Sequence, residues 1–439
     1  MHFTKVLAAI ALVSCGSQPT TSNDQTQKQA DAAELVAEPA EATKETVDEI
    51  LATMDTNINP CDDFYQYACG GWFEKNEIPA EESSWSRSFA EINERNELVI
   101  REILDSSAKA KEKPALGAYY ASCMNLEVAN KAGAGPLKGL FAEIGKVEDL
   151  AAAMKIAAEL QFLGGDVFFQ LGVDADLKNP DLMRLHLVQG GIGLPDRDYY
   201  LGTDEKAKSI LTDYEAHIVR TLVLAGAKEV QAKADAAAIV ALETELAKSH
   251  LERAKLRDVE SLHHPKDVAG MMELTPNLPW ATYFEQLGYP KLQAINVQTP
   301  TTFVALDQAL DQADPKTIQA YLRWHAAHHV SHFLSEDFRK ERFAFYGKRL
   351  NGLEEAPPDW QRCLRDTSKS LGQLLGKAYV DKKFGGDSKK IALEMIEQIE
   401  HSFADGLSEL EWMDDVTRER ALDKAKRITN KIGYPDQWR

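Results

Sequence analysis

Four histidines stand close together in the segment RWHAAHHVSHF. His325, His328, His329 and His332 recur at intervals of three and four residues, so three of them could share one face of a helix. Tetrahedral zinc accepts imidazole ligands at such a spacing. Histidines on a long amphipathic helix more often contact solvent or a neighbouring helix, and no carboxylate is evident that could orient a ligand. We therefore expect these residues to be structural, with no metal ligand among them.

A hydrolytic zinc helix of the type His-Glu-x-x-His is absent from the sequence. That motif places two imidazoles on one helix face, with the glutamate beside a zinc-bound water. His250 opens the run HLERA, which has neither the adjacent glutamate nor the second histidine. A Gly-x-Ser-x-Gly elbow and a phosphate-binding Gly-x-x-x-x-Gly-Lys loop are absent as well. We expect no catalytic residue in this chain.

Two further groups of polar residues have a functional and a structural interpretation. The run LPDRDYY places Asp196, Arg197 and Asp198 beside two tyrosines. It could be a charged recognition loop, but Pro195 fixes φ and the aspartates suit backbone donors, which favours a structural turn. The pair His263-His264 precedes a proline and has no visible partner, so a structural role is expected there too.

Chain length, composition and net charge limit the classes of protein to which the sequence can belong. The chain has 439 residues, of which 44% are hydrophobic and 27% are charged, as in globular proteins of two or three domains. Its formal net charge is −19. Such an acidic surface repels phosphates, so no nucleic-acid partner is expected.

The N-terminus has the features of an export signal. Lys5 precedes the apolar run from Val6 to Val13, which is too short to span a membrane. The run Leu-Val-Ser before Cys15 resembles a bacterial lipobox; the alternative is an ordinary secretory signal with an incidental cysteine. We interpret residues 1–14 as a lipoprotein signal peptide and residues 15–50 as a disordered acidic tether. The expected location is the bacterial cell envelope, at the outer membrane or periplasmic face, with acyl chains on Cys15 as the membrane anchor.

Export exposes the remaining cysteines to an oxidising compartment. Four of them follow Cys15, namely Cys61, Cys69, Cys123 and Cys363. Four cysteines allow three connectivities, and the spacing alone does not choose among them.

Hydrophobic periodicity predicts a mainly α fold with one small β-hairpin. Apolar residues recur at helical intervals from Ser83 to Ile103 and in most segments after residue 190. The exception lies between two helical regions, where alternating residues predict strands at Val167–Asp174 and Met183–Gln189 around a turn. The sequence stops at Arg439 without a helix cap or a polar tail, so the chain looks cut before its next element.

Several motifs in order resemble the neprilysin and endothelin-converting-enzyme family of zinc metallopeptidases. The first is PCDDFYQYACGGW followed by IP. Further matches are YYASCMN, GGIGLPDRDYYL, WQRCLRDT and EWMDDVTRERALDKAKRITNKIGYPDQWR. The resemblance runs from Asn59 to Arg439, which is nearly all of the chain that is expected to fold.

The resemblance implies that residues 51–439 are a neprilysin-like N-terminal peptidase domain. Residues 51–100 would contact a catalytic lobe, and residues 101–439 would form a large multi-helix cap. The thermolysin-like catalytic third, with its His-Glu-x-x-His helix, is absent from this chain. Zinc is expected for the complete enzyme and not in this chain, and the implied function is peptide hydrolysis by an envelope metalloendopeptidase. The alternative is a non-catalytic lipoprotein that binds peptides or a partner.

The resemblance also implies roles for single residues. Cys123 would pair with Cys363, whereas Cys61 and Cys69 would each reach a cysteine of the catalytic third and are orphans here. An arginine and an aspartate that line the family's substrate site are expected where Ser84 and Ala90 stand. Arg87 is the nearest substitute and is a weak candidate for substrate binding.

Overall fold

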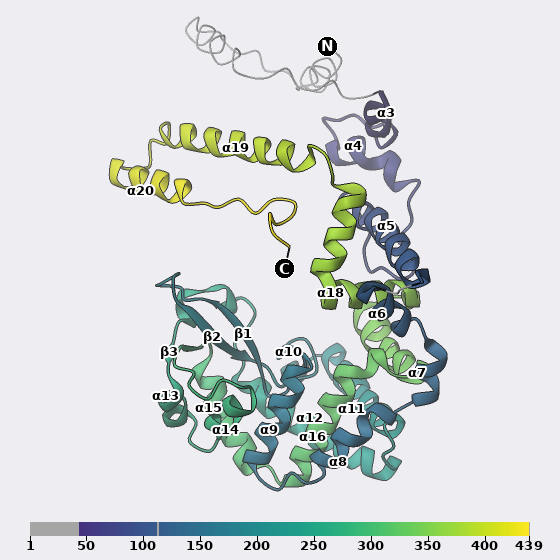
Figure 1. The fold of residues 1–439 in the computed structure, drawn as a ribbon, viewed down its shortest axis with the longest axis vertical. Helices are drawn as coiled ribbons and strands as arrows, with labels where there is room; N and C mark the ends of the chain where they lie inside the picture. The colour runs from purple at the N-terminus through teal and green to yellow at the C-terminus, as the bar shows by residue number, and fades with distance from the viewer. Residues whose placement is uncertain (1–43, 112–113, 439) are drawn as a thin grey trace, which may run out of the picture. The chain divides into compact units, whose positions relative to one another are not determined.

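The structure is a computed structural model that describes residues 44–111 and 114–438. The chain divides into two compact units, the first ending at Arg95 and the second beginning at Asn96 (Figure 1). Cys15 and the segments interpreted as signal peptide and tether lie outside the described residues, apart from residues 44–50.

The first unit is built around a short helix that contains a glycine pair in its last turns. It contains α3 (Lys44–Ala52), α4 (Phe64–Phe73) and the start of α5 (Phe89–Lys109). The Asp63 side chain caps α4 by accepting a hydrogen bond from the backbone N–H of Gln66. A Cβ at Gly71 would lie 2.6 Å from the backbone oxygen of Met54, so the second glycine of ACGGW lets two backbone segments pack directly.

The second unit is mainly helical. Before and around the sheet it contains α6 (Ala115–Cys123), α7 (Leu126–Ala132), η2 (Gly135–Leu137), α8 (Lys138–Ile144), α9 (Leu150–Phe162), α10 (Asp198–Leu201), α11 (Glu205–Leu224), α12 (Glu229–Ser249), η3 (Lys255–Arg257) and η4 (Glu260–Leu262). It continues with α13 (Val268–Leu274), α14 (Trp280–Gln286), α15 (Pro300–Gln312), α16 (Pro315–Val330), η5 (Ser331–Phe333), α17 (Glu336–Arg342), the π-helix η6 (Phe343–Leu350), α18 (Asp359–Lys383), α19 (Ser388–Leu407) and α20 (Asp415–Lys426).

A small sheet interrupts the helices. Strands β1 (Phe169–Ala175) and β2 (Met183–Gln189) form the expected antiparallel hairpin. The sheet is larger than predicted, because β4 (Ile295–Val297) pairs parallel to β2 and β3 (Pro265–Lys266) pairs with β4. The two added strands have two and three residues, too few for an alternating pattern to be recognised.

The main hydrophobic core lies among α9, α11, α12, α14, α15 and α16 and includes Trp280, Trp324 and Tyr214, all fully buried. A second, smaller core surrounds Cys363 and contains Leu104, Leu116, Tyr120, Leu364 and Leu375. Within residues 44–111 and 114–438, no helix is both long enough and apolar enough to cross a membrane.

The start of α5 differs from the prediction. A helix was expected from Ser83, but α5 begins at Phe89. The serines at positions 83, 84, 86 and 88 lie in the preceding loop, because serine hydroxyls compete for backbone groups outside helices.

Candidate functional site

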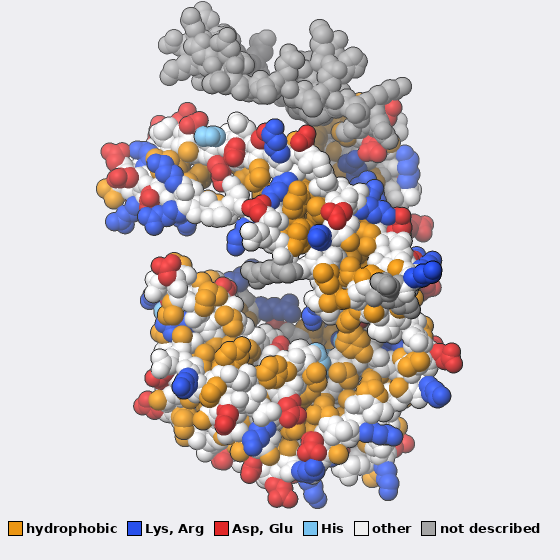
Figure 2. All heavy atoms as spheres, in the orientation of Figure 1, with side chains coloured by type: hydrophobic (Ala, Val, Ile, Leu, Met, Phe, Trp, Pro, Cys, Tyr) orange, Lys and Arg blue, Asp and Glu red, His pale blue; other side chains and the backbone are white. Residues whose placement is uncertain are grey.

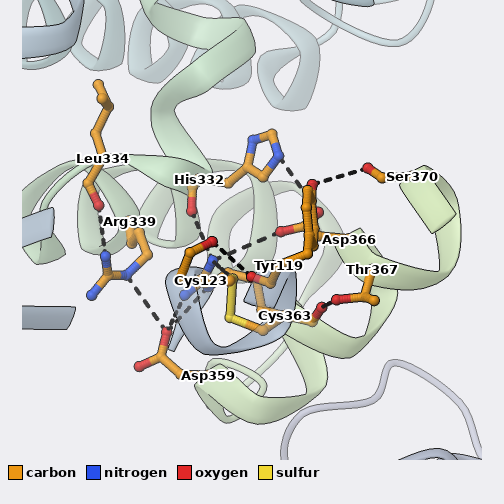
Figure 3. Close-up of a disulfide and its surroundings, with 12 residues drawn as sticks. Tyr119, Cys123, His332, Leu334, Arg339, Asp359, Cys363, Asp366, Thr367 and Ser370 are labelled. Atoms are coloured by element: carbon orange, nitrogen blue, oxygen red, sulfur yellow. Dashed lines mark hydrogen bonds and ion pairs between the residues drawn. A yellow bond between two sulfur atoms is a disulfide. The ribbon is translucent and has the colours of Figure 1, made fainter. Parts of the chain in front are cut away.

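A disulfide joins Cys123, the last residue of α6, to Cys363 in α18. The two Cα atoms are 5.7 Å apart and the residues are 240 positions apart in sequence. Figure 3 shows this bond with polar residues of α17 and α18 around it. The pairing is the one that the resemblance implies, and it links α6 to α18 across most of the second unit.

Ion pairs surround the disulfide on one side. Arg362 donates to Asp359 Oδ1 at 2.9 Å and to Cys123 Sγ at 3.1 Å. Asp366 lies 3.7 Å from His332 Nε2. Burial raises the pKa of Asp366, and burial together with nearby cations lowers the pKa of His332 to about 4. His332 is therefore neutral at pH 7, so its contact with Asp366 is not an ion pair at that pH.

The four clustered histidines have separate partners. His325 Nε2 lies 3.1 Å from Glu243 Oε1. His328 packs between Trp324 and Tyr346, and burial holds its pKa well below the usual value. His329 Nε2 lies 2.8 Å from the carbonyl oxygen of Leu163, and His332 faces Asp366.

The geometry does not fit zinc in the part of the chain that the structure describes. No group of three histidine, cysteine, aspartate or glutamate side chains in residues 44–111 and 114–438 could hold a metal ion. Helical spacing brings the histidines of α16 close together, but each imidazole is directed by a different neighbouring element.

A fully buried glutamate with three polar partners was not predicted from the sequence. Glu243 in α12 is fully buried and accepts hydrogen bonds from Tyr200 Oη at 2.6 Å and Tyr214 Oη at 2.8 Å, with His325 at 3.1 Å. Burial and the nearby carboxylate raise the pKa values of both tyrosines well above the usual value. The signal was present, since Glu243 follows Ile239 by four residues and so shares the apolar face of α12.

The loop LPDRDYY is a structural turn, and its Tyr200 takes part in the Glu243 network. Tyr200 Oη accepts the backbone N–H groups of Gly193 and Leu194 at 3.1 and 3.0 Å while it donates to Glu243. Arg197 Nη1 donates to the carbonyl oxygen of His250 at 2.5 Å. These contacts engage Tyr200 and the Nη1 atom of Arg197 within the protein, as the structural interpretation predicts.

The pair His263-His264 has a partner that the sequence did not reveal. His263 Nε2 lies 2.9 Å from Asp176 Oδ2, and Arg184 donates to the same oxygen. These donors lower the pKa of Asp176 below its usual value. Asp176 follows β1 and is 87 residues from His263, so no local pattern connects the two.

The remaining candidates lie in the first unit. Arg87, like Ser84, is an exposed loop residue, and Ala90 lies in the first turn of α5. Cys69 in α4 is a free thiol, whereas Cys61 has an interaction partner and is not a free thiol. Substrate binding by Arg87 and pairing of the two cysteines with a catalytic lobe stay predictions.

The fold and the disulfide together define the class: a mainly helical domain of the neprilysin type, with α6 tied to α18. Comparison with protein families agrees, since the profile described as peptidase family M13 matches residues 60–435. The chain belongs to peptidase family M13. The resemblance drawn from the sequence motifs is thereby confirmed.

Individual relatives show how much of the family's length is present. Endothelin-converting enzyme 1 of Rattus norvegicus is 33% identical over 414 residues, which are 90% of this chain and 53% of that protein. Neprilysin-3 of Drosophila melanogaster is 30% identical over 412 residues, 88% of this chain and 52% of that protein. The chain therefore spans about half the length of the curated relatives it matches.

Among solved structures, the Mycobacterium tuberculosis zinc metalloprotease Zmp1 in complex with an inhibitor is similar to this chain. The TM-score is 0.82 at 28% identity, and the match covers 89% of this chain and 60% of that protein. The mainly α architecture with a small sheet is thus shared with a zinc metalloprotease of the same family.

Proposed function

We propose that this chain is the N-terminal domain of a cell-envelope zinc metalloendopeptidase that hydrolyses peptides. Membership of peptidase family M13 carries the proposal. The matched relatives include endothelin-converting enzymes, and a similar structure is that of a zinc metalloprotease. The chain corresponds to about half of these relatives, and the motif His-Glu-x-x-His does not occur in it. We therefore assign zinc and the hydrolytic step to a C-terminal part equivalent to the half of the relatives that is not matched.

An apolar stripe on α19 supports this division. Ile391, Met395, Ile399 and Phe403 recur every fourth residue, and between 54% and 59% of each side chain is exposed. Figure 2 shows apolar side chains at the surface of this region of the molecule. A contiguous exposed apolar surface on a soluble domain indicates a binding face. We assign the stripe on α19 to contact with the C-terminal part of the M13 fold.

Peptide hydrolysis would then require the complete protein. In the helical domain the buried Glu243 network and the disulfide hold the helices in place, and the zinc supplied by the C-terminal part would polarise the scissile carbonyl and activate water when bound. No step is assigned to the four clustered histidines of α16 and η5, because each of them is already engaged.

Fusion to the C-terminal half of a family M13 relative tests the proposal. The fused protein should hydrolyse an unstructured peptide, and a zinc chelator should abolish that activity. Ile399→Glu in the α19 stripe should lower the activity, whereas Glu397→Gln, an exposed change on the same helix, should not. A folded fusion that binds peptides without cleaving them would favour a non-catalytic binding lipoprotein instead.

We also propose export and lipid anchoring at Cys15. The support is the run Leu-Val-Ser-Cys after an apolar segment and the polar, acidic sequence that follows. Mass spectrometry of the N-terminal peptide from a bacterial membrane fraction tests it. Acylated Cys15 is expected, and an unmodified Cys15 in the mature protein would contradict the proposal.

A further inference from the structure

A cavity of about 770 Å³ lies beside the disulfide region, among α17, η6 and the start of α18. Figure 3 shows His332, Arg339, Asp359 and Asp366, which belong to its wall. The charged residues that line it are Glu336, Arg339, Lys340, Arg342, Asp359, Arg362, Arg365 and Asp366.

The wall carries an excess of positive charge. Five of these eight residues are cations and three are carboxylates, and His332 is neutral at pH 7 because its pKa is lowered to about 4. Four of the cations have carboxylate partners within 4 Å. The pairs are Arg339–Asp359, Lys340–Glu336, Arg362–Asp359 and Arg365–Glu97.

Arg342 is the exception. No carboxylate of the described residues lies within ion-pair distance of its guanidinium. Its Nη1 atom donates to the carbonyl oxygen of His328 at 3.2 Å and to Ser331 Oγ at 3.3 Å, and the guanidinium lies 5.2 Å from the ring centre of Tyr346. Burial lowers the pKa of Arg342, and a charge that is partly removed from water is costly unless an opposite charge lies beside it.

The geometry of Arg342 leaves one edge of the guanidinium available. The contacts given above use Nη1 alone, and within the described part of the chain Nε and Nη2 have no acceptor. These two nitrogens form the edge that binds a carboxylate or phosphate with two parallel hydrogen bonds. Asp366 Oδ2 is buried and lies 3.8 Å from Arg362 Nη1, so this carboxylate faces Arg362 and not Arg342.

We propose that this cavity is a binding site for a small oxyanion, a carboxylate or a phosphate, with Arg342 as its main ligand. The anion supplies the counter-charge that the protein does not place beside Arg342. Its source is either free inorganic phosphate or the C-terminal carboxylate of a short peptide. The site requires no zinc and no peptidase activity, so its test is independent of the proposed function.

Isothermal titration of the full 439-residue chain decides the proposal. Inorganic phosphate, an acetylated dipeptide with a free carboxylate and the same dipeptide amide are titrated at pH 7 and constant ionic strength. Saturable binding of phosphate or of the free acid is expected, without binding of the amide. Arg342→Met should weaken this binding about tenfold or more, because it removes a charged hydrogen-bond donor pair.

Arg349→Met is the matched control. Arg349 lies in η6, the π-helix that follows Arg342 directly, pairs with Asp213 at 2.5 Å and does not line the cavity, so its loss should leave anion binding unchanged. If Arg342→Met does not fold, Arg342→Lys replaces it in the test. This variant keeps the positive charge but lacks the paired donors, so it should still bind the anion more weakly than the wild type. Absence of saturable binding to the wild type, or equal affinity in a folded Arg342 variant, overturns the proposal.

Discussion

Removing the disulfide between Cys123 and Cys363 is expected to lower the free energy of unfolding of the second unit by a large amount. The bond closes a loop of 240 residues, and the loop-entropy relation gives about 5 kcal/mol at 25 °C for a loop of that length. Cys363 is fully buried in a core with Leu364 and Leu375. Replacement of both cysteines by alanine therefore adds a smaller loss of packing of about 1 kcal/mol.

Guanidinium denaturation followed by circular dichroism measures this loss. The wild type and the variant Cys123→Ala/Cys363→Ala are compared without reductant, and then with dithiothreitol. The free energy of unfolding of the wild type should fall towards that of the variant when dithiothreitol is added, because the loop is then open in both proteins. Cys69→Ala is the control, since Cys69 is a free thiol and its removal opens no loop.

A small effect would refute the reasoning. A loss below about 1 kcal/mol in the double variant would show that the unfolded chain gains little freedom from opening this loop. An equal loss in Cys69→Ala would show that the effect comes from cysteine replacement and not from the cross-link.

Three further predictions concern the second unit. Glu243→Gln should lower the free energy of unfolding by about 3 kcal/mol, because it replaces the carboxyl group that accepts two buried tyrosine hydroxyls; chemical denaturation of Glu245→Gln, an exposed change on the same helix, should show almost no loss. The free energy of unfolding should fall as the pH drops from 6.5 towards 4, because His332 binds a proton in the unfolded chain and not in the folded one. The melting temperature of a His332→Gln variant should therefore depend less steeply on pH than that of the wild type, whereas His401→Gln should keep the wild-type dependence. Ile399→Glu should reduce binding of an apolar fluorescent dye to the isolated chain without lowering its melting temperature, because Ile399 is exposed; an unchanged dye signal would argue against the α19 stripe.

The local elements could be predicted because their signals are short-range. In α9, Asp149 accepts the backbone N–H of Ala152 at the start, and Gly164 has φ +82° just after the end. Strand β2 has the predicted bounds, Met183–Gln189. Each of these features depends on residues within a few positions of one another, which is why the sequence pattern was sufficient.

The interactions at the candidate sites could not be predicted because they join distant segments. The ring nitrogen of His263 reaches Asp176 across 87 residues, and Tyr200 reaches Glu243 across 43. Helical spacing placed the histidines of α16 and η5 near one another, but the contacts of His325, His329 and His332 are with α12, the residue after α9 and α18. The spacing of the cysteines did not predict the pairing of Cys123 with Cys363. Only the resemblance to a known family implied it.

Hydrolysis by the chain alone is the most direct test of the central claim. The 439-residue protein is incubated with zinc and an unstructured peptide, with and without a chelator, and the products are followed by mass spectrometry. We predict no chelator-sensitive cleavage, because the proposal assigns zinc and catalysis to a C-terminal part. Turnover by this chain that a chelator abolishes would contradict the account.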